Sequence, residues 1–176
     1  DDPKTVVQIA AKHVCVLFRR FRHFRDDVTR PHIRSLEARR IPHVLVGGHS
    51  FHQREEVQAI RNALNAIEWP DDKLHVFATL RGPLFAISDD TILSYRSRID
   101  SLHPLRRLTE EQLDELNDDE RQVDAALTVL SELHYHRNRR PIAETITRLM
   151  HAVRAHAGIA IWPTGEQSLA NCLRLV

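Results

Sequence analysis

A run of arginines in the first thirty residues is the part of the sequence best suited to phosphate chemistry. Arg19, Arg20, Arg22 and Arg25 follow the apolar segment His13–Phe18. An open parallel sheet places its ligand crevice at the carboxyl ends of the strands. An arginine there can stabilise the charge that develops on a terminal phosphate. Arg19 is therefore the candidate for that role; the alternative is that all four arginines are solvated.

Phenylalanines interleave with these arginines at Phe18, Phe21 and Phe24. Aromatic side chains among basic ones can form a stacking platform for single-stranded nucleic acid. Phenylalanines three residues apart also form one side of a helix core, and that alternative stays open.

The pair Gly47-Gly48 could let backbone amides approach a phosphate. Two glycines without further residues do not define a phosphate loop, and the sequence contains no GxxxxGK[ST]. The chain therefore does not carry a complete ATP cradle.

The densest basic cluster follows later, as His134, His136, Arg137, Arg139 and Arg140. It is suited either to phosphate contacts or to a solvated helix end with cations near its C-terminus. Two histidines that are two residues apart on a helix point in different directions and make a poor metal site. The sequence also has no HExxH motif and no His/Cys quartet, so we expect no bound metal and find no complete active site.

These residues require a scaffold, and the apolar pattern predicts strands at His13–Phe18 and His43–Val46 with a helix at Asp26–Arg40 between them. Such an order favours a parallel pair with a right-handed crossover. The remaining pattern is helical, with N-caps at Ser88 and Thr109. The further predicted helices are a segment containing Val57–Ile67, Leu74–Leu80, Ser88–Ile99, a helix starting at Thr109, Glu120–Arg137, Pro141–Ala157 ended by Gly158, and Glu166–Val176.

Composition places the chain among ordinary soluble proteins, with 42% hydrophobic and 28% charged residues and a net charge of +1. It has no apolar run long enough for a membrane span, and its two cysteines match no ligand spacing. We expect a cytoplasmic protein without membrane contact. The start without methionine and the end inside a predicted helix suggest a piece of a larger protein.

Three segments carry a family resemblance. CVLFRRF at Cys15–Phe21 resembles a motif of apolar strand, aromatic, Arg, Ser, Asn. Gly47–Leu64 resembles a motif with paired glycines, paired phenylalanines, an arginine and a glutamate, in which His52 replaces the second phenylalanine. Trp69–Leu93 resembles NPDD…LRSPLFGLSDDEL, with Gly82 in place of Ser and Ala86 in place of Gly. The chain thus resembles UvrD/Rep-type superfamily 1 DNA helicases, in particular their AddA/RecB-like exonuclease-helicase branch.

The resemblance implies an α/β fold that is predominantly helical. Residues 1–105 would be part of the second RecA-like motor domain, with a few short parallel strands, and residues 106–176 part of its helical insertion. Arg19 would be catalytic and contact the γ-phosphate of ATP, which binds with Mg²⁺ mainly on parts absent here. The other implied residues are Gly47, Gly48, Arg54 and Glu56 for the nucleotide, and Phe51, His52, Arg81, Arg137, Arg139 and Arg140 for nucleic acid.

The implied function is that of part of an ATP-dependent helicase that translocates on single-stranded DNA and unwinds duplex DNA in recombination and repair. Its partners would be single-stranded and duplex DNA and a nuclease or helicase subunit. The chain by itself lacks Walker A and B sequences and is expected to be inactive. The alternative is a non-enzymatic helical DNA-binding or adaptor module derived from a helicase domain. A metal-dependent hydrolase would require histidines to converge from distant segments.

Overall fold

The computed structural model describes residues 8–23, 26–44, 51–162 and 164–176. The chain forms two compact units, Asp1–Phe51 and His52–Val176. The sequence boundary predicted at residue 105 lies inside the second unit, because α4 (Asp89–Ile99) packs against α6 (Asp118–His136) across it.

The described residues of the first unit form few regular elements. Its described elements are η1 (Ala11–His13), β1 (Arg22–His23), β2 (Asp26–Asp27) and α1 (Arg30–Ala38). The two strands pair antiparallel. Around them, the Phe18 ring lies 6.2 Å from that of Phe21 and 5.2 Å from that of His32 on α1. These contacts favour the packing role of the phenylalanines over a free stacking platform.

The predicted α/β fold is wrong for the described residues. His13–Phe18 forms no strand, and within it Val14, Val16 and Leu17 are 63%, 64% and 89% exposed. A strand buried on both faces needs paired neighbours and covering helices, and this run has neither in the described structure. Of the second predicted strand, His43 and Val44 have no regular structure, and residues 45 and 46 lie outside the described residues.

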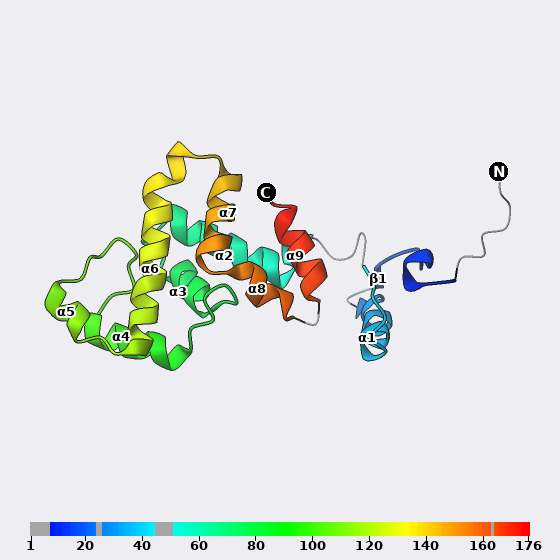
Figure 1. The fold of residues 1–176 in the computed structure, drawn as a ribbon, viewed down its shortest axis with the longest axis horizontal. Helices are drawn as coiled ribbons and strands as arrows, with labels where there is room; N and C mark the ends of the chain where they lie inside the picture. The colour runs from blue at the N-terminus through cyan, green and yellow to red at the C-terminus, as the bar shows by residue number, and fades with distance from the viewer. Residues whose placement is uncertain (1–7, 24–25, 45–50, 163) are drawn as a thin grey trace. The chain divides into compact units, whose positions relative to one another are not determined.

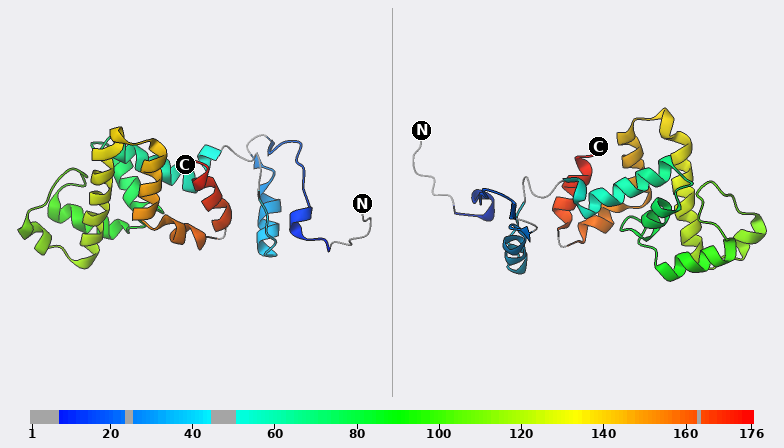
Figure 2. Two further views of the ribbon diagram at one scale, coloured as in Figure 1. Left: turned by 45° about the horizontal axis from the view of Figure 1, so that its top comes forward. Right: turned by 180° about the vertical axis from the view of Figure 1, so that it is seen from behind.

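The second unit is helical throughout its described part (Figure 1). α6 is its longest helix, and α2 and α7 both pack against it. Figure 2 shows this assembly from two further sides. The helices not yet given are η2 (Phe51–Gln53), α2 (Glu55–Glu68), α3 (Lys73–Arg81), α5 (Glu110–Asp114), η3 (Arg137–Arg139), α7 (Ile142–Ala152), α8 (Ala155–Ala160) and α9 (Gly165–Leu173).

One apolar core holds these helices together. Ala63 of α2, Leu80 of α3, Leu130 of α6 and Leu149 of α7 are all 0% exposed. Each apolar stripe had the 3.6-residue period of a helix that buries one face. Burial of these stripes against one another is the main stabilising contribution to the unit.

Helix ends follow the capping residues that the sequence predicted. Ser88 Oγ accepts a hydrogen bond from the backbone N–H of Thr91, and Thr109 forms a capping box with Gln112. The predicted helix 141–157 is instead divided, because Arg154 adopts a left-handed backbone (φ 50°) between α7 and α8. Gly158 was predicted to end a helix but lies within α8.

Two glycines near α8 and α9 give a matched stability prediction. A Cβ at Gly165 would lie 2.5 Å from the carbonyl oxygen of Ala160 and 2.6 Å from that of Ile159. Because both obstacles are backbone, Gly165→Ala should lower the free energy of unfolding by about 2 kcal/mol. At Gly158 a Cβ meets nothing within 4 Å, so Gly158→Ala should raise it by about 0.5–1 kcal/mol. Urea denaturation of both variants checks this, and a neutral Gly165→Ala would contradict the close approach of α8 and α9.

No helix among the described residues is long and apolar enough to cross a membrane.

Candidate functional site

The residues predicted to contact ATP fall on both units. Arg19 is exposed and lies in a bend, not at the end of a strand. Gly47 and Gly48 lie outside the described residues. Arg54, at the N-cap position of α2, is half-buried.

Glu56, in the first turn of α2, is the predicted site residue with the most defined surroundings. It is 5% exposed, and its Oε1 accepts a hydrogen bond of 2.6 Å from Asn171 Nδ2 on α9. Asn171 Oδ1 in turn accepts from Gln167 Nε2 at 3.1 Å. The carboxylate therefore joins α2 to α9, which is a structural use of its charge. Sequence reasoning did not assign Asn171 or Gln167, since they follow Glu56 by more than a hundred residues.

The buried end of α9 also contains Cys172, which is 0% exposed. Burial, and secondly the negative charge of Glu56, raise the pKa of this thiol to about 11. A thiol held protonated at neutral pH is a poor nucleophile. Cys172 is therefore a core residue.

The predicted nucleic-acid residues near α2 and α3 lie on the surface. Phe51 is half-buried and His52 exposed in η2, and the side chain of Gln58 donates a hydrogen bond to the carbonyl oxygen of His52. Arg81 Nε lies 2.7 Å from Asp89 Oδ1, and both side chains are about 60% exposed. An ion pair this exposed contributes little to stability, so Arg81 can exchange Asp89 for another anion at small cost.

A small cavity of about 160 Å³ lies between α2 and the turn after α3. Gln58, Asn62, Thr79 and Pro83 are among its lining residues. Ligand pockets usually measure about 300–1,000 Å³, so this hollow is too small for a nucleotide. Residues of both Gly47–Leu64 and Trp69–Leu93 line this cavity.

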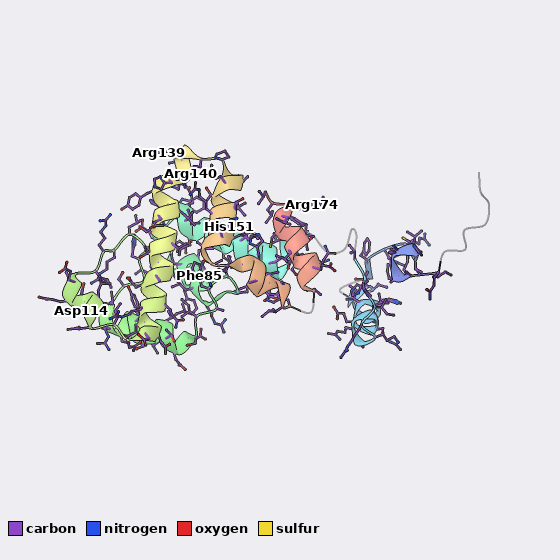
Figure 3. The ribbon with its side chains drawn as sticks, in the orientation of Figure 1. Phe85, Asp114, Arg139, Arg140, His151 and Arg174 are labelled. Carbon is purple, nitrogen blue, oxygen red and sulfur yellow. The ribbon has the colours of Figure 1, made fainter. Side chains whose placement is uncertain are left out.

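The basic cluster predicted at residues 134–140 divides into two parts. His134 Nδ1–H donates to the carbonyl oxygen of Ile67 at 2.6 Å, and Arg137 Nε donates to Glu68 at 3.1 Å. These contacts tie the end of α6 to the end of α2. Arg139 is exposed, and Arg140 Nε lies 3.6 Å from Glu144 Oε1. Figure 3 shows Arg139 and Arg140 where the chain turns from α6 to α7.

The second part of this cluster borders a larger cleft of about 610 Å³ between α6 and α7. The polar residues that line it are Glu132, His136, Arg140, Arg148 and His151. The sequence analysis did not single out Arg148 or His151, because both lie on the helix after the basic run. Their i, i+3 spacing on α7 was the signal that could have found them.

No group of three His, Cys, Asp or Glu side chains in the described part of the chain lies close enough to hold a metal ion. The comparisons with known proteins add no family. No family model, curated protein or solved structure matches this chain.

Proposed function

We propose that this chain is part of an ATP-dependent DNA helicase of the UvrD/Rep type, from an exonuclease-helicase subunit that acts in the cytoplasm on recombination and repair intermediates. The observation that carries the proposal is the adjacency of two motif segments. Gly47–Leu64 and Trp69–Leu93 each resemble that family, and α2 and α3 from these segments pack directly on one another. The two segments follow one another in the sequence, and α2 and α3 form one helical hairpin that contains residues of both resemblances.

The local geometry of the second segment supports the same proposal. Leu80 and Leu84 are buried, Ser88 caps α4, and Asp89 pairs with Arg81. Several residues that match the family pattern therefore have structural roles in this fold, in the core, at a helix cap or in an ion pair.

Ala86 adds a conformational argument. Its φ is 53°, in the left-handed region that favours glycine, and glycine is the residue of the family pattern at this position. At Gly82 the chain departs from the pattern, where serine is usual, and a Cβ there would lie 2.7 Å from the carbonyl oxygen of Ala78. A serine at this position would therefore require the turn after α3 to shift.

In this proposal Arg19 contacts the γ-phosphate of ATP bound with Mg²⁺ by other parts of the complete protein. Arg54 and Glu56 position α2, and the exposed basic residues contact single-stranded and duplex DNA. Positioning of the triphosphate and neutralisation of its charge supply nearly all the catalysis in phosphoryl transfer. The chain by itself is then expected to hydrolyse no ATP.

The decisive experiment measures single-stranded-DNA-stimulated ATP turnover of the polypeptide encoded by the complete reading frame. Arg19→Ala should lower kcat by roughly 10³-fold, the usual effect of removing an arginine that stabilises the transferred phosphoryl group. Arg34→Ala, an exposed arginine on α1, is the matched control and should change kcat less than about twofold.

Two outcomes would overturn this proposal. One is a reading frame without GxxxxGK[ST] ahead of these residues, which would leave the non-enzymatic DNA-binding or adaptor module. The other is an Arg19→Ala variant with unchanged kcat.

A further inference from the structure

The cleft between α6 and α7 gathers cationic side chains from both helices. Arg140 follows the turn after α6, while Arg148 and His151 come from α7 and His136 from the last turn of α6. Figure 3 shows His151 on α7 and Arg140 at the turn. Leu133, Val129 and Ala152 form the apolar part of the lining. Four donor-bearing side chains therefore border one open hollow of about 610 Å³.

Glu144 orients the two arginines. Its Oε1 lies 2.9 Å from Arg148 Nε and 3.6 Å from Arg140 Nε. These contacts use only the Nε atoms, and among the described residues neither arginine makes a further side-chain hydrogen bond. The forked Nη groups of two arginines, fixed through one carboxylate, are thus left to bind an oxyanion with several acceptor oxygens.

The cleft has equal numbers of acidic and basic side chains. The positive charges of Arg140 and Arg148 are offset by Glu132 in the lining and Glu144 beside it. His136 and His151 add imidazole N–H donors. His156 of α8 adds a third imidazole, since its ring lies 5.3 Å from that of His151.

We propose that this cleft binds a phosphate group through Arg140, Arg148, His136 and His151. In the proposed helicase, the phosphate group bound in this cleft is a backbone phosphate of DNA. The DNA assignment rests on the proposed helicase function, whereas phosphate binding stands on the geometry of the cleft. A tetrahedral phosphate can accept from several arginine and imidazole donors at once, which a planar carboxylate with two oxygens does less well.

The first test is a titration of the chain with inorganic phosphate at pH 6, followed through the histidine ring signals by NMR. The rings of His136 and His151 should shift saturably. Arg148→Gln should weaken binding at least about fivefold, as expected for loss of one charge-assisted contact. The matched control is Arg96→Gln, an exposed arginine on α4 outside the cleft, which should leave the binding constant unchanged. Absence of a saturable shift, or equal binding by Arg148→Gln, would overturn the site.

A double variant isolates the contribution of the histidines. Sulfate is the probe, since it keeps its double charge near neutral pH while phosphate does not. His136→Gln/His151→Gln should bind sulfate at least about fivefold more weakly than the unchanged chain, as expected for the loss of two donors. Equal sulfate binding by that variant would overturn the assignment of the two histidines.

The source of the phosphate is tested by fluorescence anisotropy with labelled single-stranded DNA and with labelled polyglutamate. DNA binding that weakens in Arg148→Gln and not in Arg96→Gln supports a backbone phosphate. Binding of polyglutamate in preference to DNA would overturn the phosphate proposal. If phosphate binds but DNA does not, the DNA assignment fails while the site remains. The helicase proposal is tested separately by the ATP turnover of Arg19→Ala, so the two can fail independently.

Discussion

Glu120→Ala is expected to lower the free energy of unfolding of the helical unit by about 2–3 kcal/mol, because a buried side chain loses its hydrogen bonds. The Glu120 side chain is 1% exposed, yet it accepts a hydrogen bond from Ser94 at 2.7 Å and one from Arg98 at 3.1 Å. It also closes the capping box with Asn117 at the start of α6. Truncation removes all three contacts and leaves Arg98, which is 41% exposed, without its partner. Urea denaturation followed by circular dichroism measures the loss.

The matched control is Asp118→Ala, two residues before Glu120 and exposed on the same helix. It should change the unfolding free energy by less than about 0.5 kcal/mol. A loss in Glu120→Ala no larger than that of the control would show that α4 and α6 do not depend on this carboxylate.

The ionisation of Glu120 should also make the free energy of unfolding fall at acidic pH. The Ser94 hydroxyl, followed by the Asn117 N–H and the charge of Arg98, lowers the pKa of Glu120 below its usual value of 4.5. A carboxyl with a depressed pKa in the folded state stabilises the fold above its unfolded pKa and loses this contribution as the pH falls. Stability should therefore decline below about pH 4.5, and Glu120→Gln should show a shallower decline. Equal slopes in the two proteins would contradict the assignment.

Asn171→Ala is expected to lower the free energy of unfolding by about 2–3 kcal/mol, because it leaves the carboxylate of Glu56 buried without its donor. Asn171 is 8% exposed and Glu56 is 5% exposed, so water replaces the lost contact only in part. The 2.6 Å hydrogen bond between them links α9 to α2. The measurement is a double-mutant cycle with Glu56→Ala under urea denaturation.

In that cycle the double variant should be more stable than the sum of the single losses predicts, by about 1–2 kcal/mol, because the buried charge is gone. Glu55→Ala is the control, since Glu55 is exposed in the same first turn of α2. Additive losses would mean that Glu56 and Asn171 do not act on each other.

The helices of residues 52–176 could be predicted because their signals are local. Ser88 and Thr109 each act within a few residues of where they stand. The split at Arg154 could not be predicted, because arginine ordinarily avoids the left-handed region and only the packing of α7, α8 and α9 holds it there. The predicted strand at His13–Phe18 failed for a related reason. An apolar run becomes a strand only when it pairs with other strands, and the described β1 and β2 pair only with each other.

The candidate sites show the same division. By itself, the sequence determined which helices form, where their caps lie and which segments resemble a helicase, since these depend on residue type and short spacing. Only the tertiary structure decided that Arg137 pairs with Glu68, that Asn171 donates to Glu56, and that Arg148 and His151 face the cleft beside Arg140. These arrangements join residues from different helices. Helical periodicity predicts which face of a helix is buried, but it does not predict which other helix packs against that face.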